Sequence, residues 1–215
     1  MKNWLSILIC VVFIASAQAQ KKPSEGKVVY ELSYEKQDST QKVPKPSNAV
    51  VYFSKNMLRM EMNTGSGYES VTIFDMKAKK SIMLIELAGK KYAIENNKAD
   101  RKTAKEVKKS KPITYVDETK MIAGYPCKRA DIQLKKNLYS VYYTEEIESR
   151  NATFNSPLYE IDGFLMEFWV NSNNQNVKMS AKEINTEPVD KKLFEIPADF
   201  IYTTREELRH MFQSK

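Results

Sequence analysis

The sequence predicts a mainly β protein, built on an antiparallel sheet of many strands with only a few short helices. Apolar and polar side chains alternate in many short segments, and turn-forming residues separate these segments at short intervals. Apart from the charge-dense residues 96–111, helical patterns are confined to two short stretches near the C-terminus. With 42% hydrophobic and 28% charged residues, the composition is ordinary for a globular protein, and we expect one domain over residues 20–215.

The alternation is clearest in residues 27–35, which we expect to form the first strand. One face of it carries Val28, Tyr30, Leu32 and Tyr34. Residues 49–54 and 57–62 repeat the pattern on either side of Lys55 and Asn56, which predicts a hairpin. Further strands are expected at residues 68–76, 81–87, 89–94, 113–118, 128–134, 138–144, 163–171 and 177–186. Short turns between successive strands predict an antiparallel meander.

The few helical elements are expected at the end of the chain. Residues 190–194 favour a helical turn, and residues 204–213 favour a short capped helix. Two other segments have too few apolar residues to belong to a core. Residues 37–48 are polar and contain two prolines, which predicts a loop. Residues 96–111 are dense in charge, and we expect either a solvated helix or a solvated excursion there.

Residues 1–19 have the organisation of a cleaved secretory signal peptide. Lys2 supplies a positive charge, residues 5–15 form an apolar core too short to span a bilayer, and Ala17 and Ala19 form a small-x-small cleavage site. An uncleaved membrane anchor is the alternative, although no stop-transfer run follows. The sequence therefore predicts a periplasmic or secreted protein with no integral membrane span after cleavage.

The formal net charge is +7, which invites an anionic partner. However, the lysines are scattered among acidic residues, and no basic stripe alternates with stacking aromatic side chains. We therefore expect no nucleic-acid partner. Cys127 is the only cysteine outside the predicted signal peptide, so an intramolecular disulfide is not expected, and burial is the commoner fate of a free cysteine.

Residues suited to catalysis are sparse. His210 is the only histidine and lies in a charged segment, which disfavours Ser-His or Cys-His pairs and a His-based zinc site. The sequence has no glycine-rich phosphate loop and no Asp-rich calcium loop. The pairs Glu145 with Glu146 and Glu167 with Glu183 are expected to be solvated rather than to act in acid–base catalysis. We predict no enzymatic activity, no catalytic or metal-binding residue and no cofactor.

Methionines are frequent in and beside the predicted strands. They are Met57, Met60, Met62, Met76, Met83, Met121, Met166 and Met179. Together with aromatic side chains, methionine makes an adaptable lining for flexible hydrophobic ligands. The same residues can equally fill the core of a curved sheet, and both interpretations stay open at this point.

Residues 119–130, Thr-Lys-Met-Ile-Ala-Gly-Tyr-Pro-Cys-Lys-Arg-Ala, resemble the I-x-G-Y-x-C-K-K-A segment of exported bacterial proteins with LolA-like and LolB-like folds. These include uncharacterised families of the Bacteroidetes, among them the GLPGLI type. Similar landmarks follow the same order in residues 26–31, 58–61, 71–75, 142–147, 161–167 and 193–198. The resemblance implies a strongly curved antiparallel half-barrel whose hydrophobic concave face is covered by helices or loops. In LolA and LolB that cavity carries the acyl chains of lipoproteins.

The leading hypothesis is a non-enzymatic exported protein that holds a lipid or a lipoprotein acyl chain in the concave face of such a half-barrel. The candidate lining residues all lie on apolar faces of predicted strands. They are Tyr30, Leu32, Leu58, Met60, Met62, Phe164, Met166 and Phe168. The alternative is an envelope protein with a filled core and no ligand, which acts through protein contacts made by its sheet edges or by residues 96–111.

Overall fold

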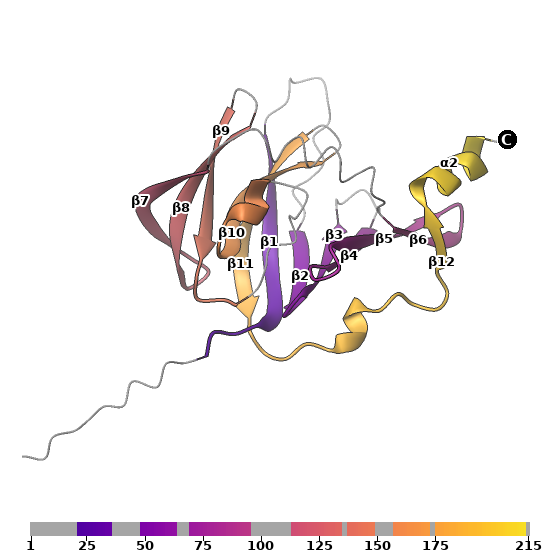
Figure 1. Ribbon diagram of the computed structural model, residues 1–215, viewed down its shortest axis with the longest axis horizontal. Helices are drawn as coiled ribbons and strands as arrows, with labels where there is room; N and C mark the ends of the chain where they lie inside the picture. The colour runs from indigo at the N-terminus through magenta and orange to yellow at the C-terminus, as the bar shows by residue number, and fades with distance from the viewer. Residues whose placement is uncertain are drawn as a thin grey trace, which may run out of the picture.

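A computed structural model describes residues 21–35, 48–63, 69–95, 113–134, 137–148, 157–172 and 175–213. Its strands form one sheet in the order β12-β6-β5-β4-β3-β2-β1-β11-β10-β9-β8-β7 (Figure 1). Neighbouring strands are antiparallel except for β12 and β6, which are parallel. The predicted mainly β class with a large antiparallel sheet is confirmed.

The strands are β1 (Glu25–Tyr34), β2 (Asn48–Ser54), β3 (Met57–Asn63), β4 (Glu69–Asp75), β5 (Lys80–Leu87), β6 (Lys90–Glu95), β7 (Ile113–Ile122), β8 (Tyr125–Leu134), β9 (Asn137–Thr144), β10 (Phe164–Ser172), β11 (Gln175–Asn185) and β12 (Ile201–Thr204). The helical elements are the 3-10 turns η1 (Pro157–Glu160) and η2 (Lys191–Phe194) and the helix α2 (Arg205–Gln213).

The sheet is curved and open. Figure 1 shows β7, β8 and β9 to one side of the upright strands β1, β10 and β11, while β3 to β6 extend to the other side toward α2. Strands β7 and β12 are the two ends of the strand order, and they do not pair with each other. This arrangement agrees with the expected half-barrel.

The two faces of the sheet have different coverings. We call the face that bears Tyr30 and Met60 the inner face and the opposite one the outer face. The main core lies on the inner face of β1, β2, β3 and β8 to β11, and buried side chains alternate with more exposed ones along β1 and β2. A second inner-face cluster lies on β5 and β6, where Leu208 of α2 packs against it.

The outer face of β3 to β6 carries a third apolar cluster. It is formed by Ile73, Leu84 and Ala93, against which Ile196 and Phe200 pack. Near this cluster, the Arg59 guanidinium donates a hydrogen bond to the Leu193 carbonyl at 3.1 Å. The chain that leaves β11 therefore crosses the outer face of the meander before it returns as β12.

The predicted hairpin, meander and terminal helix are confirmed. Helix α2 begins with a reciprocal capping box, because the Glu207 carboxylate accepts from Thr204 N at 2.8 Å and Glu207 N donates to the Thr204 hydroxyl at 3.2 Å. In η2, the Asp190 carboxylate accepts from Lys192 N at 3.0 Å. The short strand β12, which pairs with β6, was not predicted.

The prediction for residues 113–134 was wrong in its boundaries. β7 continues beyond Glu118 to Ile122, and β8 already begins at Tyr125. A bulge between Val116 and Thr119 breaks the period-2 pattern that the sequence argument relied on. Ala123 and Gly124 have φ values of 48° and 84°, as the two central residues of a tight I′ hairpin turn require.

Three predicted features cannot be compared with the structure. The signal peptide at residues 1–19 and the charged segment at residues 96–111 lie outside the described residues. The polar loop at residues 37–48 also lies outside them, apart from Asn48, which begins β2.

Candidate functional site

The structure brings all eight predicted lining residues to one inner-face cluster. Six of them are between 0 and 4% exposed and are core side chains here: Tyr30, Leu32, Leu58, Phe164, Met166 and Phe168. The other two, Met60 and Met62, are only partly buried and pack against that core. The predicted lining is therefore a packed floor with two methionines at its surface.

A polar contact lies inside this floor. The Tyr30 hydroxyl donates to the Leu165 carbonyl at 2.7 Å, and its ring meets Phe168 edge-on with centroids 5.6 Å apart. Burial raises the pKa of the Tyr30 hydroxyl far above its usual range. The group stays protonated and acts as a donor, so it fixes the floor rather than serving as a base.

Beyond the floor, a strip of partly buried side chains continues across the meander. We define the inner-face strip as Met60, Met62, Phe74 and Met83. Met60 and Met83 both pair with Thr72 of β4, so the two methionines lie on the same face, two strands apart. Phe74 packs against the main core and Met83 against the second inner-face cluster. Together with Thr72, which lies between Met60 and Met83, the strip connects the two buried clusters, and its methionines are polarizable and adaptable.

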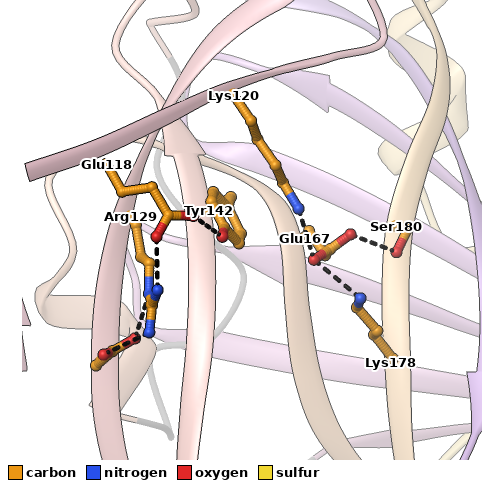
Figure 2. Close-up of polar contacts among 8 residues, drawn as sticks. Glu118, Lys120, Arg129, Tyr142, Glu167, Lys178 and Ser180 are labelled. Carbon is orange, nitrogen blue, oxygen red and sulfur yellow. Dashed lines mark hydrogen bonds and ion pairs between the residues drawn. The ribbon is translucent and has the colours of Figure 1, made fainter. Parts of the chain in front are cut away.

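The outer face of β7 to β11 carries an ionic network centred on Glu167. Its carboxylate lies 3.0 Å from Lys120 Nζ and 2.9 Å from Lys178 Nζ, and Ser180 Oγ donates to it at 3.2 Å (Figure 2). The Glu167 side chain is 14% exposed, so the expectation that it is solvated was wrong. Burial by itself raises the pKa of the carboxyl, but hydrogen bonds from Lys178 and Lys120 outweigh burial, and the pKa lies below its usual value.

The network continues on β7, β8 and β9. Arg129 donates to both Asp131 oxygens, at 2.8 and 2.9 Å, and to Glu118 at 2.6 Å. The Tyr142 hydroxyl donates to Glu118 at 2.5 Å, as Figure 2 shows. Lys120 Nζ lies 3.6 Å from the Tyr142 ring centroid, and this contact joins the two halves of the network.

These partners hold the network in its charged form. The hydrogen bond from Tyr142, with that from Arg129, lowers the pKa of Glu118, and the Arg129 guanidinium lowers that of Asp131. General acid–base catalysis needs a group whose pKa lies near the working pH. The pKa values of the carboxylates in this network are instead lowered, away from neutral pH, so the arrangement suits a structural and binding surface.

Sequence reasoning missed this network. The available signal was the recurrence of charged and polar residues at every second position of neighbouring strands, on the face opposite the apolar one. The erroneous end of the strand at Glu118 hid it, because Lys120 then lay outside the predicted strands.

Next to Glu167 the outer face is hollowed into a groove of about 540 Å³, which we call the outer groove. It is lined by Glu35, Asn137, Leu138, Tyr139, Ser140, Glu167, Trp169 and Lys178. A second groove, of about 610 Å³, is lined by Lys21, Lys22, Ser24, Lys55, Asn56, Glu145, Ile147, Glu148, Asp162 and Gly163. Both grooves are lined mainly by polar side chains.

The prediction that Cys127 is buried is confirmed. Its side chain is 0% exposed, its thiol donates to the Tyr125 carbonyl at 3.3 Å, and burial raises its pKa to about 11. His210 lies exposed on α2. Among the described residues, no group of three or more His, Cys, Asp or Glu side chains is arranged to hold a metal ion.

No helix in the described part of the chain combines the length and the apolar character needed to cross a membrane.

Comparison with solved structures places the fold beside PNGF-II. One PNGF-II structure superimposes with a TM-score of 0.55 at 14% identity, covering 87% of this chain and 32% of that one. A second PNGF-II structure gives 0.54 at 13% identity, covering 88% and 33%. This chain thus spans about a third of the PNGF-II chains, and the similarity shows the fold alone. MucB in complex with MucA(peri) has a TM-score of 0.36 at 8% identity, covering 81% and 55%.

No curated protein matches the chain in sequence. The relation to LolA-like and GLPGLI-type proteins stays a prediction. One family model matches residues 39–157, more than half of the sequence, and the chain belongs to that family, a domain of unknown function designated DUF4412.

Proposed function

We propose that this protein is an exported, non-enzymatic binding protein that holds a lipid or a lipoprotein acyl chain on the inner face of its curved sheet. The observation that carries the proposal is the inner-face strip. It is apolar, only partly buried, and continuous with two buried clusters. An acyl chain laid along it would gain about 25 cal/mol for each Å² of apolar surface removed from water.

The eight predicted lining residues then divide into two roles. Met60 and Met62 contact the ligand directly, since they lie at the surface of the core. The six core side chains form the floor beneath and keep its shape. Methionine has three rotatable bonds and a polarizable sulfur, so the strip can adapt to chains of different length and unsaturation.

Two further observations support a binding role. The ionic network on the outer face holds its carboxylates charged and paired, which does not suit acid–base chemistry. The predicted signal peptide at residues 1–19 would deliver the protein to a compartment where lipids and lipoproteins are handled.

Titration with cis-parinaric acid, a fluorescent fatty acid, tests the proposal. Met60→Glu places a charge on the strip, and we expect at least a tenfold weaker affinity, which corresponds to about 1.4 kcal/mol. The matched control is Met121→Glu, which adds the same charge at a side chain that is 66% exposed on β7. Unchanged binding by Met60→Glu, with native circular dichroism, would exclude the strip as the site.

The second candidate function is protein contact through the β7 edge. β7 is the last strand in the order of the described sheet, and Tyr115 and Met121 are 56% and 66% exposed on it. Exposed edge strands are templates for pairing with another chain. Under this candidate, site-specific crosslinking from position 121 captures a defined envelope protein and Met121→Glu abolishes that capture. Met60→Glu then has no effect.

A further inference from the structure

We propose that the outer groove is a saccharide-binding site, specific for a neutral, polyhydroxylated ligand. This site is independent of the inner face, because Trp169 and Glu167 alternate along β10 with Met166 and Phe168 of the core. The groove and the proposed acyl-chain site therefore lie on opposite faces of the same strands.

An aromatic platform forms the apolar part of the groove. Trp169 is partly exposed and lines the groove together with Tyr139, and their ring centroids lie 5.6 Å apart at 54°. The Tyr139 hydroxyl accepts from Asn176 at 3.0 Å and from Asn137 at 3.3 Å, which fixes the ring. A pyranose ring has an apolar C–H face that packs against aromatic rings. Because the Tyr139 ring is already fixed by its hydrogen bonds, little conformational entropy is lost on binding.

The polar part of the groove offers both donors and acceptors. Ser140 supplies a hydroxyl, Asn137 an amide, Glu167 a carboxylate and Lys178 an ammonium group; each already has a partner within the protein and keeps further donor or acceptor capacity. Sugar hydroxyls both donate and accept, so they satisfy such a mixed set better than an acyl chain does. At about 540 Å³ the groove falls in the usual range of small-ligand sites, about 300–1,000 Å³.

The charges in the groove argue for a neutral ligand. Lys178 is paired with Glu167 at 2.9 Å, and Glu167 is also paired with Lys120. Glu35 accepts a hydrogen bond from Asn176 at 2.7 Å. An anionic ligand would be repelled by the carboxylates of Glu35 and Glu167. The cation that could attract it, Lys178, is already paired with Glu167. A neutral saccharide avoids this repulsion and leaves the ion pairs intact.

Tryptophan fluorescence of the full chain reports on this site directly. The sequence has two tryptophans, Trp4 and Trp169, so Trp4→Phe leaves Trp169 as the sole reporter. The probes are neutral oligosaccharides, namely maltohexaose, cellohexaose, chitohexaose and mannohexaose, with oligogalacturonate as the anionic comparison. We expect at least one neutral probe to change the Trp169 emission in a saturable manner, and oligogalacturonate to leave it unchanged.

Calorimetric titration of variants then locates the site. Trp169→Ala should weaken binding at least tenfold, about 1.4 kcal/mol. The control is Tyr115→Ala, which removes an aromatic side chain that is 56% exposed and outside the groove, and it should bind normally. If Trp169→Ala fails to fold, the indole N–H resonance of Trp169 in the Trp4→Phe chain serves instead and should shift on saturation.

Three results would overturn the proposal. They are no binding of any neutral probe, binding of oligogalacturonate alone, and binding that leaves the Trp169 resonance and emission unchanged.

Discussion

The Tyr30 hydroxyl on β1 donates to the Leu165 carbonyl on β10 at 2.7 Å, although β11 lies between these two strands. Strands two places apart in a flat sheet are separated by about 9–10 Å, and side chains stand roughly perpendicular to it. The bond therefore depends on the sheet curving toward its inner face. A bulge between Leu165 and Glu167 disrupts the β9–β10 ladder at this point. The Tyr30 hydrogen bond thus stabilises the curvature of the sheet at the point where the β9–β10 pairing is irregular.

Tyr30→Phe tests whether this hydrogen bond stabilises the curved sheet. The change removes only the hydroxyl and takes a buried donor away from the Leu165 carbonyl, so we expect a loss of about 1–3 kcal/mol in the free energy of unfolding. Tyr115→Phe, at an exposed tyrosine, should change stability by less than about 0.5 kcal/mol. Urea denaturation of both variants measures the difference. Equal stability of the two would mean that the Tyr30 hydroxyl does not hold the bend.

Glu167→Gln should make the protein less sensitive to acid. The pKa of Glu167 in the folded protein lies below its ordinary value of 4.5. The stabilisation that the charged carboxylate gives the fold is therefore complete above pH 4.5 and is lost as the pH falls through the folded pKa. At neutral pH we expect the variant to be about 2 kcal/mol less stable. The gap should close in acid. Thermal unfolding as a function of pH measures it, with exposed Glu183→Gln as the control. A gap that does not change with pH would contradict the ion-pair account.

Cys127 should resist alkylation in the folded protein. Its thiol is 0% exposed and its pKa is about 11, so the reactive thiolate is both scarce and inaccessible at about pH 8. In a Cys10→Ser chain it is the sole cysteine. Iodoacetamide should label it slowly without denaturant and rapidly in guanidinium chloride, as mass spectrometry would show. Equal rates under the two conditions would place the thiol at the surface.

A pair of alanine variants distinguishes the buried core residues of the inner face from the partly buried residues of the strip. Met166→Ala removes a side chain that is 0% exposed and should cost about 2–5 kcal/mol of unfolding free energy. Met60→Ala removes a partly buried one and should cost about 1 kcal/mol or less, while weakening the binding of cis-parinaric acid. A large stability loss in Met60→Ala would make this residue part of the core.

The sequence predicted much of the sheet because strands such as β1 and β2 alternate buried and more exposed side chains. Val28, Tyr30 and Leu32 are buried on one face of β1 as the pattern required. The prediction failed where another effect disturbed the period. The bulge after Val116 shifted the alternation in β7, and the four residues of β12 are too few to show a period, although they pair with β6, which is distant in the sequence.

The candidate sites were predictable only in part, for a related physical reason. Alternation places Met60 and Met166 on the same face, but it does not distinguish a packed floor from a partly open strip. The burial of Glu167 depends on Lys178 of the next strand, β11, and on Lys120 of β7, which lies 47 residues away in the sequence. Pairing of this kind follows from strand order and register, which a single sequence does not contain.

The acyl-chain proposal is tested most directly by native mass spectrometry of the protein that is expressed from the full sequence, exported by its own host and purified without detergent. Organic extraction of the same sample identifies any bound molecule. The account predicts a stoichiometric lipid or acyl species that is lost from Met60→Glu and kept by Met121→Glu. A clean unliganded mass, unchanged after incubation with the host's envelope lipids, would contradict it and favour protein contact through the β7 edge.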